Sequence, residues 1–275
     1  MCKIGVEMEG EKQPLLAMRG ITKSFGGLRA VTDVDLTLHE GQILAIVGDN
    51  GAGKSTLIKI LTGVYQPDAG EIFICGAKVE MSSRRDSIRV GVNAVYQNLG
   101  LVDALPAPAN VFLGNEPVRR ILGIPFLDNR RMREETERIL IENTGVKLED
   151  ATVPTLNLSG GQRQAVAIAR AVLVADLKVL VMDEPTAALG PEETRNTLAL
   201  IRAVRDRGIA VIVISHNLEH VFAVADRVMV MRGGRKIGEV DTATSSGTEV
   251  LGMIVGSAVG AGAHATTPST LGAQQ

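Results

Sequence analysis

Residues 48–56 read GDNGAGKST and match the phosphate-loop pattern G-x4-G-K-[ST]. The apolar run QILAIVGD (42–49) leads into them and predicts a buried strand, whereas KSTLIKILTG (54–63) predicts a helix that ends at Gly63. This strand, turn and helix form the context in which the motif binds phosphate, because glycines let backbone N–H groups converge on an anion. We therefore predict the core of a P-loop NTPase.

Within this loop, Lys54 can reach the terminal phosphates of a nucleotide, and the hydroxyl of Ser55 can bind Mg²⁺. We expect the following residues to contact the phosphates: Gly48, Asp49, Asn50, Gly51, Ala52, Gly53, Lys54, Ser55 and Thr56.

A pair of carboxylates ends the apolar segment KVLVMDE (178–184). Open parallel sheets bind their ligands at the carboxyl ends of the strands, so both acids should face the nucleotide. We expect Asp183 to hold Mg²⁺, directly or through water, and Glu184 to orient and deprotonate the attacking water.

Two more polar residues follow apolar strand-like segments. His216 ends IVISHN, and Gln97 closes VNAVYQ (92–97). Both should emerge at the same sheet edge as the carboxylates, so we count both among the catalytic residues. The Gln97 amide is placed to contact both the metal ion and the attacking water.

The remaining pattern defines the fold class. Residues 16–40 alternate apolar and polar around Gly26 and predict an antiparallel β edge at the N-terminus. Later strands and helices alternate, which predicts a mainly parallel sheet covered on both faces. The expected strands are 71–79, 92–97, 178–183, 209–215 and 227–231, and the expected helices after the insertion are 191–206 and 217–224.

We predict one α/β domain over residues 15–256, with a flexible tail at 1–14 and a disordered tail at 257–275. Residues 98–158 begin with two closely spaced prolines, Pro106 and Pro108, and contain the charged amphipathic segment RRMREETERILIENTG, so we interpret them as an inserted helical subdomain. No apolar run approaches the roughly 20 residues that a membrane-spanning helix needs. With 29 basic and 31 acidic residues, the chain lacks the positive field typical of nucleic-acid binding.

A second potential anion site lies at LSGGQ (158–162), where two glycines precede a strong helix-forming segment. Its candidate nucleotide-binding residues are Ser159, Gly160, Gly161 and Gln162. One chain with a complete phosphate loop has no evident need for two such sites.

The phosphate loop, Gln97, LSGGQ, LVMDE and His216, in that order, resemble the nucleotide-binding subunit of an ATP-binding cassette (ABC) transporter. The resemblance covers roughly residues 16–255 and implies ATP and Mg²⁺ as ligands, with Phe25 stacked on adenine. It leaves open that Phe25 is instead a core-facing strand residue. The resemblance also implies that cassettes pair head to tail, so that Ser159, Gly160 and Gly161 of one copy close over the γ-phosphate held by the other.

Further segments, NVFLGNEPVRR (110–120) and FLDNRRMREE (126–135), resemble sugar importers of the ribose, xylose and fructose type. This implies a homodimer or a paired cassette subunit, a transmembrane permease, and indirectly a periplasmic sugar-binding protein. The chain would act at the cytoplasmic face of the inner membrane and bind no nucleic acid. The segment SFGGLRAV also resembles branched-chain amino-acid importers, which stay an alternative.

One departure concerns Gly190, where the family usually has an aspartate that crosses the dimer interface. Either Glu192 or Glu193 substitutes for it, or the two sites are coupled more loosely. We expect hydrolysis to survive, because Glu184 and His216 are present.

Three other classes fit less well. A cassette ATPase of chromosome or repair machinery needs a long coiled coil before LSGGQ, and a ribosome-associated protein needs two cassettes with a basic linker; neither feature occurs. A non-hydrolysing regulatory module would have lost Lys54 or Glu184, and both are retained.

Overall fold

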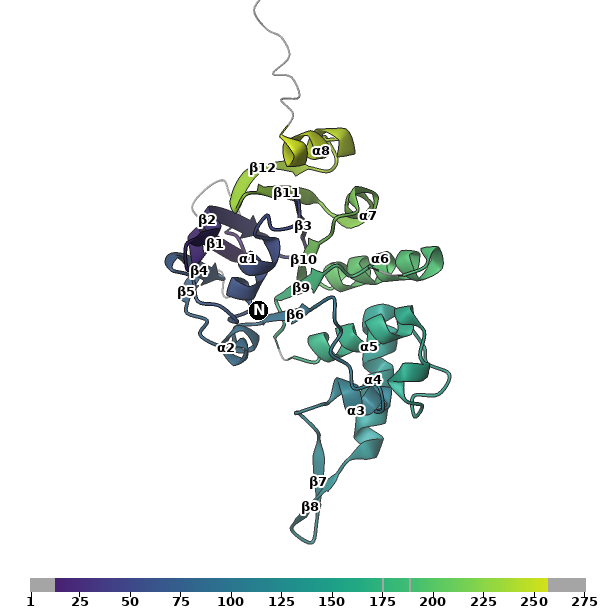
Figure 1. Ribbon diagram of the computed structural model, residues 1–275. Helices are drawn as coiled ribbons and strands as arrows, with labels where there is room; N and C mark the ends of the chain where they lie inside the picture. The colour runs from purple at the N-terminus through teal and green to yellow at the C-terminus, as the bar shows by residue number, and fades with distance from the viewer. Residues whose placement is uncertain (1–12, 175, 188, 257–275) are drawn as a thin grey trace, which may run out of the picture.

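The computed structural model describes residues 13–174, 176–187 and 189–256. Two large β-sheets meet at the centre, and a helical part with a projecting hairpin extends from one end (Figure 1). The predicted flexible tails fall outside the described residues, apart from residues 13 and 14, and stay predictions.

The central sheet has six strands in the order β12-β11-β3-β10-β9-β6. All neighbouring strands are parallel except β11 and β12, which confirms the predicted mainly parallel sheet. The polar strand β12 was not predicted, because its sequence RKIGEVD carries no buried-strand pattern. The bounds are β3 (Ile43–Val47), β6 (Val92–Val95), β9 (Val179–Asp183), β10 (Ala210–Ile214), β11 (Arg227–Arg232) and β12 (Arg235–Asp241).

The second sheet is antiparallel, in the order β2-β1-β4-β5, and confirms the predicted N-terminal β edge. Its strands are β1 (Leu16–Phe25), β2 (Leu28–Leu38), β4 (Ala69–Ile74) and β5 (Ala77–Val79). The single strand predicted at 71–79 is wrong, since the chain turns at Cys75 and Gly76, both with positive φ, and returns as β5.

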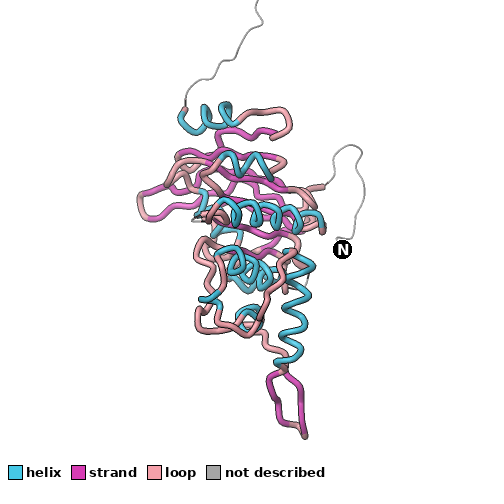
Figure 2. Tube along the Cα trace, turned by 90° about the vertical axis from the view of Figure 1, so that its right-hand side faces the viewer, coloured by secondary structure: helices cyan, strands magenta, loops and turns pink. Residues whose placement is uncertain are grey.

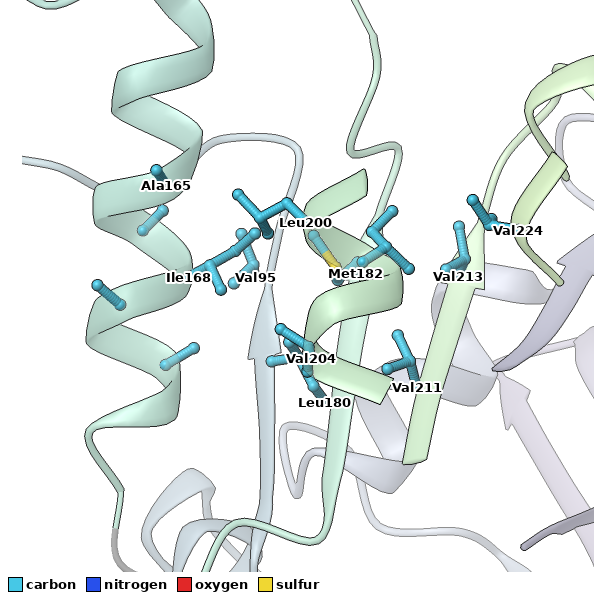
Figure 3. Close-up of a cluster of buried hydrophobic side chains, with 14 of the residues drawn as sticks. Val95, Ala165, Ile168, Leu180, Met182, Leu200, Val204, Val211, Val213 and Val224 are labelled. Carbon is cyan, nitrogen blue, oxygen red and sulfur yellow. The ribbon is translucent and has the colours of Figure 1, made fainter. Parts of the chain in front are cut away.

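Successive residues of β3 point to opposite faces of the central sheet, as in any strand. Ile43, Ala45 and Val47 pack with α5 (Gly160–Val172), α6 (Pro191–Asp206) and α7 (Leu218–Val224). Figure 3 shows this side, where Met182 of β9 lies beside Leu200 of α6 and Val213 of β10 lies beside Val224 of α7. Leu44 and Ile46 pack on the other face with α1 (Lys54–Leu61) and the antiparallel sheet. The sheet is therefore covered on both faces, as predicted.

The insertion contains the helices α3 (Ala107–Val111), α4 (Asn129–Thr144) and the 3-10 turn η1 (Thr155–Asn157). It also contains a hairpin of β7 (Val118–Ile121) and β8 (Ile124–Leu127), which the prediction of a helical subdomain did not include. Both views show this hairpin projecting beyond the helices (Figures 1 and 2). The remaining helices are α2 (Arg84–Arg89) and α8 (Gly247–Val255). Over the described residues, none of the helices combines the length and apolar character needed to span a membrane.

Candidate functional site

Strand register brings the predicted site residues to one edge of the central sheet. Ile214 of β10 pairs with Ile46 of β3 on one side and with Asp183 of β9 on the other. β9 in turn pairs with β6, where Met182 lies opposite Val95. The phosphate loop, His216, Glu184 and Gln97 therefore all leave the sheet at its carboxyl edge.

Backbone contacts brace the phosphate loop, and two of its positions accept only glycine. Gly48 has φ 149°, and a Cβ there would lie 2.1 Å from the carbonyl oxygen of Met231. Gly53 has φ 98°, and its Cβ would lie 2.5 Å from the carbonyl oxygen of Ala30. The Gly234 N–H also donates to the Ala52 carbonyl at 3.1 Å. The turn after β11 thus holds the loop, a role that the sequence analysis missed, although the pair GG at 233–234 signals a turn.

Lys54 begins α1 and folds back over the loop. Its ammonium donates to the carbonyl oxygens of Gly48, at 2.7 Å, and Asp49, at 2.9 Å. The residue is only 9% exposed, and this burial lowers the pKa of Lys54, opposed by the charges of Glu184, Asp183 and Asp49. A cation held this way is directed at the space enclosed by the loop.

Glu184 follows β9 in a left-handed conformation, with φ 52°. Its N–H donates to the Ile214 carbonyl at 2.9 Å, and its Oε2 lies 2.9 Å from Nδ1 of His216. The Glu184 side chain is 17% exposed and that of His216 is 75% exposed. A carboxylate fixed by an imidazole at the rim of a cleft is suited to orient a water and accept its proton.

Asp183 is the only acid among the three candidate metal ligands, the others being Ser55 and Gln97. Burial raises the pKa of Asp183, as does the neighbouring charge of Glu184, whereas Lys54 and Lys59 oppose the rise. No cluster of three or more His, Cys, Asp or Glu side chains forms a metal cage within the described ranges. A carboxylate, a hydroxyl and an amide oxygen fit Mg²⁺, which takes few protein ligands and relies on substrate phosphates for others.

Gln97 is exposed and lies just beyond β6. Its neighbour Tyr96 shares a hydrogen bond of 2.9 Å with the hydroxyl of Thr62, the residue that caps α1. This bond ties the start of the insertion to the helix that follows the phosphate loop. Nothing in the sequence pattern pointed to it.

The LSGGQ segment starts α5 with a capping box. The Ser159 hydroxyl accepts from the Gln162 N–H at 3.3 Å, and Oε1 of Gln162 accepts from the Ser159 N–H at 2.9 Å. The Gln162 side chain is thereby committed to the helix start. The Gly161 N–H donates to Oε1 of Glu193 at 3.3 Å.

One chain does not bring the two anion sites together. Gly160, Gln97 and Glu184 line one small open pocket with Leu189, and none of residues 48–56 lines it. In Figure 1, α5 lies on the side of the insertion and α1 lies beside the antiparallel sheet. A second chain is needed if LSGGQ is to meet a phosphate loop.

Phe25 ends β1 and is 42% exposed, which excludes the alternative of a core-facing aromatic. Its ring meets the edge of Tyr65 at a centroid distance of 5.0 Å, and the Lys23 ammonium lies 5.7 Å from its centre. Tyr65, which follows α1, was not predicted as part of this cluster. The pair offers an exposed aromatic surface, as an adenine ring requires.

Gly190 is exposed and caps α6. Of the two acids considered as substitutes for the usual aspartate, Glu193 is engaged within its own chain: Oε2 accepts from the Gly190 N–H at 3.3 Å and Oε1 from Gly161. Glu192 is exposed.

Comparison with known proteins places this site in context. The protein-family model described as ABC transporter matches residues 31–187. The chain is 42% identical over 223 residues to the xylose/arabinose import ATP-binding protein XylG of Sulfolobus acidocaldarius, covering 81% of this chain and 86% of the relative. It is 44% identical over 230 residues to the fructose import ATP-binding protein FrcA of Rhizobium meliloti, covering 82% and 88%. It is 38% identical to the ribose import ATP-binding protein RbsA of Clostridium perfringens, and spans 48% of that protein.

Solved structures share the fold. An ATP-binding cassette of an ABC transporter in its ADP conformation superposes with a TM-score of 0.73 at 23% identity, over 90% of this chain and 97% of that one. A dimeric post-hydrolysis cassette bound to ADP and Pi superposes with a TM-score of 0.67 at 25% identity, over 82% and 98%.

Proposed function

Because this chain belongs to the ABC transporter family, we propose that it is the ATP-binding and ATP-hydrolysing subunit of an importer for a monosaccharide of the xylose, fructose or ribose type. One observation carries the catalytic part. At the edge of the sheet, Glu184 is hydrogen-bonded to His216 and lies next to Asp183. The carboxylates of Glu184 and Asp183 both interact electrostatically with the buried ammonium of Lys54.

In this proposal the loop N–H groups of residues 48–53 and the Lys54 ammonium hold the nucleotide phosphates, and Phe25 stacks on adenine. Ser55, Asp183 and Gln97 are the residues that would hold Mg²⁺. When bound, the ion neutralises charge that develops on the phosphate oxygens.

Hydrolysis then depends on residues at the sheet edge. Glu184 accepts a proton as the water oxygen bonds to the γ-phosphorus, and the bond from that phosphorus to the bridging oxygen breaks, leaving ADP and phosphate. His216 holds the Glu184 carboxylate in place through the 2.9 Å hydrogen bond. The left-handed backbone of Glu184 fixes the origin of its side chain.

We extend the proposal to a head-to-tail pair of cassettes, in which Ser159, Gly160 and Gly161 of one copy contact the γ-phosphate held by the other. In one chain α5, which begins at LSGGQ, and α1, which follows the phosphate loop, lie in different parts of the molecule (Figure 1), which supports this pairing, as does the dimer among the similar structures. The matched 223 and 230 residues make up 86% of XylG and 88% of FrcA, so each of those relatives has room for only one cassette, which favours a homodimer or a pair of separate cassette subunits.

The membrane partners complete the proposal: a transmembrane permease, and a periplasmic sugar-binding protein that acts through it, with the cassettes at the cytoplasmic face of the inner membrane. The names of the similar proteins XylG, FrcA and RbsA favour a sugar over a branched-chain amino acid.

Purification of the tagged chain from membranes tests this function. We expect a polytopic permease to co-purify, and ATP hydrolysis by the complex to rise when the cognate sugar and its receptor are added. Co-purification of an amino-acid permease would overturn the sugar assignment, whereas the absence of any ATPase activity would overturn the enzymatic one.

A further inference from the structure

The hairpin β7–β8 stands apart from the rest of the molecule. Figures 1 and 2 show it extending beyond α3 and α4, with its turn farthest from the sheets. At its base the Asp128 N–H donates to the Pro117 carbonyl at 2.9 Å, next to the start of α4. Every residue from 118 to 127 is exposed.

Apolar side chains dominate this exposed hairpin. They are Val118, Ile121, Leu122, Ile124, Phe126 and Leu127. Exposed apolar residues scattered singly over a surface need no explanation, but a contiguous group on one projecting element marks an interaction site.

The most exposed of these apolar residues, Leu122, lies in the turn of the hairpin. Ile121 pairs with Ile124, so Leu122 and Gly123 form a two-residue turn in which both have positive φ, 50° and 83°. Such turns favour asparagine or aspartate followed by glycine, because a leucine there is strained. Leu122 is nevertheless 98% exposed, so no packing within the chain offsets its strain. An apolar outlier of this kind indicates contact with something outside the chain.

The charged residues of the hairpin are all positive, and they lie on β7. Residues 117–127 carry Arg119 and Arg120 and no acid, although the whole chain has a net charge of -2. Along this fully described stretch, the side chain of neither arginine forms a hydrogen bond or ion pair within the chain. Arg120 precedes Leu122 by two residues, which in a strand is about 7 Å.

We infer that this hairpin is a membrane contact, inserting Ile121, Leu122 and Ile124 into the interface of an anionic bilayer while Arg119 and Arg120 bind lipid phosphates. Interfacial segments bury apolar side chains about 5–10 Å deep, which matches the spacing between the tip and the arginines. Anionic headgroups complement the unpaired arginine side chains, so charge complementarity favours a lipid surface. This contact adds to the proposed function, and its test requires neither ATP nor a permease.

Flotation of the purified full chain with lipid vesicles tests the inference. We expect the chain to float with vesicles of phosphatidylglycerol and phosphatidylcholine, and to float much less with phosphatidylcholine alone or at high salt. Leu122→Asn places a residue that tolerates the turn but removes the apolar side chain at its tip. Arg119→Gln with Arg120→Gln removes both positive charges of the hairpin. Each variant should bind the anionic vesicles about tenfold more weakly or worse.

Matched controls lie at distant exposed positions. Leu251→Asn on α8, at the opposite end of the molecule in Figure 1, and Arg195→Gln with Arg207→Gln along α6 should float as the unmodified chain does. Thermal unfolding midpoints equal to that of the unmodified chain verify that each hairpin variant folds. The inference is overturned if the unmodified chain fails to float, or if the hairpin variants float equally well.

Discussion

At the scale of single residues, the site contains residues whose backbone conformation or buried charge is energetically unfavourable in the absence of a ligand. Glu184 has a left-handed backbone, Asp183 is a half-buried acid with a raised pKa, and Lys54 is a buried amine with a lowered pKa. Such costs concentrate at functional sites, where they fix the groups that act.

Replacing the proposed base tests its role directly. Glu184→Gln keeps the shape of the side chain but cannot accept a proton, so ATP hydrolysis should fall by about 10²–10⁴-fold while ATP binding persists. Phosphate release and nucleotide binding measure the two effects. Glu142→Gln, at an exposed position of α4, should keep full activity. If the unmodified dimer hydrolyses ATP no faster than Glu184→Gln, then Gly190 or another departure has abolished catalysis.

The raised pKa of Asp183 predicts that replacing this residue increases the stability of the nucleotide-free chain but abolishes its activity. Its folded pKa is raised above the ordinary value of 3.8, so the folded state favours the protonated form, and the ionised form costs stability. Asp183→Asn should therefore unfold at a higher temperature than the unmodified, nucleotide-free chain at pH 7, yet lose Mg²⁺-dependent hydrolysis. The stability difference should shrink as the pH falls through the folded pKa toward 3.8. Calorimetry across pH checks this, and equal midpoints at pH 7 would contradict it.

Residue positions at the strand ends could be predicted because a parallel sheet collects them at one edge. Side-chain partners could not. Tyr65 beside Phe25, Thr62 beside Tyr96 and Glu193 beside Gly161 are distant in sequence, and no spacing rule relates them.

At the scale of elements, the phosphate loop is shaped as much by its neighbours as by its own glycines. Ala30 at β2 and the turn after β11 press against it from two directions. The motif predicted flexible glycines, and the structure shows that two of them are sterically required.

A matched pair of substitutions separates backbone strain from collision. Gly51→Ala has positive φ but open space around its Cβ, so it should cost about 1–2 kcal/mol of unfolding free energy. Gly53→Ala adds a collision with the Ala30 carbonyl and should cost distinctly more, with loss of ATP binding. Denaturant unfolding measures the free energy of unfolding of both variants. Equal losses would show that the loop can move to accommodate a Cβ at residue 53 without further loss of stability.

Apolar strands and long amphipathic helices were predicted because burial imposes their pattern. The strands β5, β7, β8 and β12 were missed because they are short or exposed and do not need that pattern. The pairing of β7 with β8, for example, is set by the turn at Leu122 and Gly123. Leucine is atypical at such a position, so the sequence did not indicate a hairpin turn there.

At the scale of the whole molecule, the arrangement predicts an ATP-dependent dimer. Glu184→Gln saturated with Mg-ATP should dimerise in light scattering. In that background, Ser159→Asp keeps a good helix cap but adds a charge that repels the γ-phosphate, and should abolish the dimer. Ser159→Asn supplies the same cap without the charge and should largely retain it. A dimer that survives Ser159→Asp would exclude the proposed LSGGQ contact.

The Gly161 amide in the lone chain already has an anionic ligand, the carboxylate of Glu193. In the proposed dimer, a γ-phosphate presented by the other copy would therefore replace this carboxylate instead of binding an unpaired amide. The free energy gained at this amide would be the difference between binding the phosphate and binding the carboxylate of Glu193. The displaced carboxylate would stay close to the amide, because Glu193 belongs to α6. Closure of the proposed dimer would then be a ligand exchange at Gly161, and the Glu193 carboxylate would favour its reversal after hydrolysis by competing for the same amide.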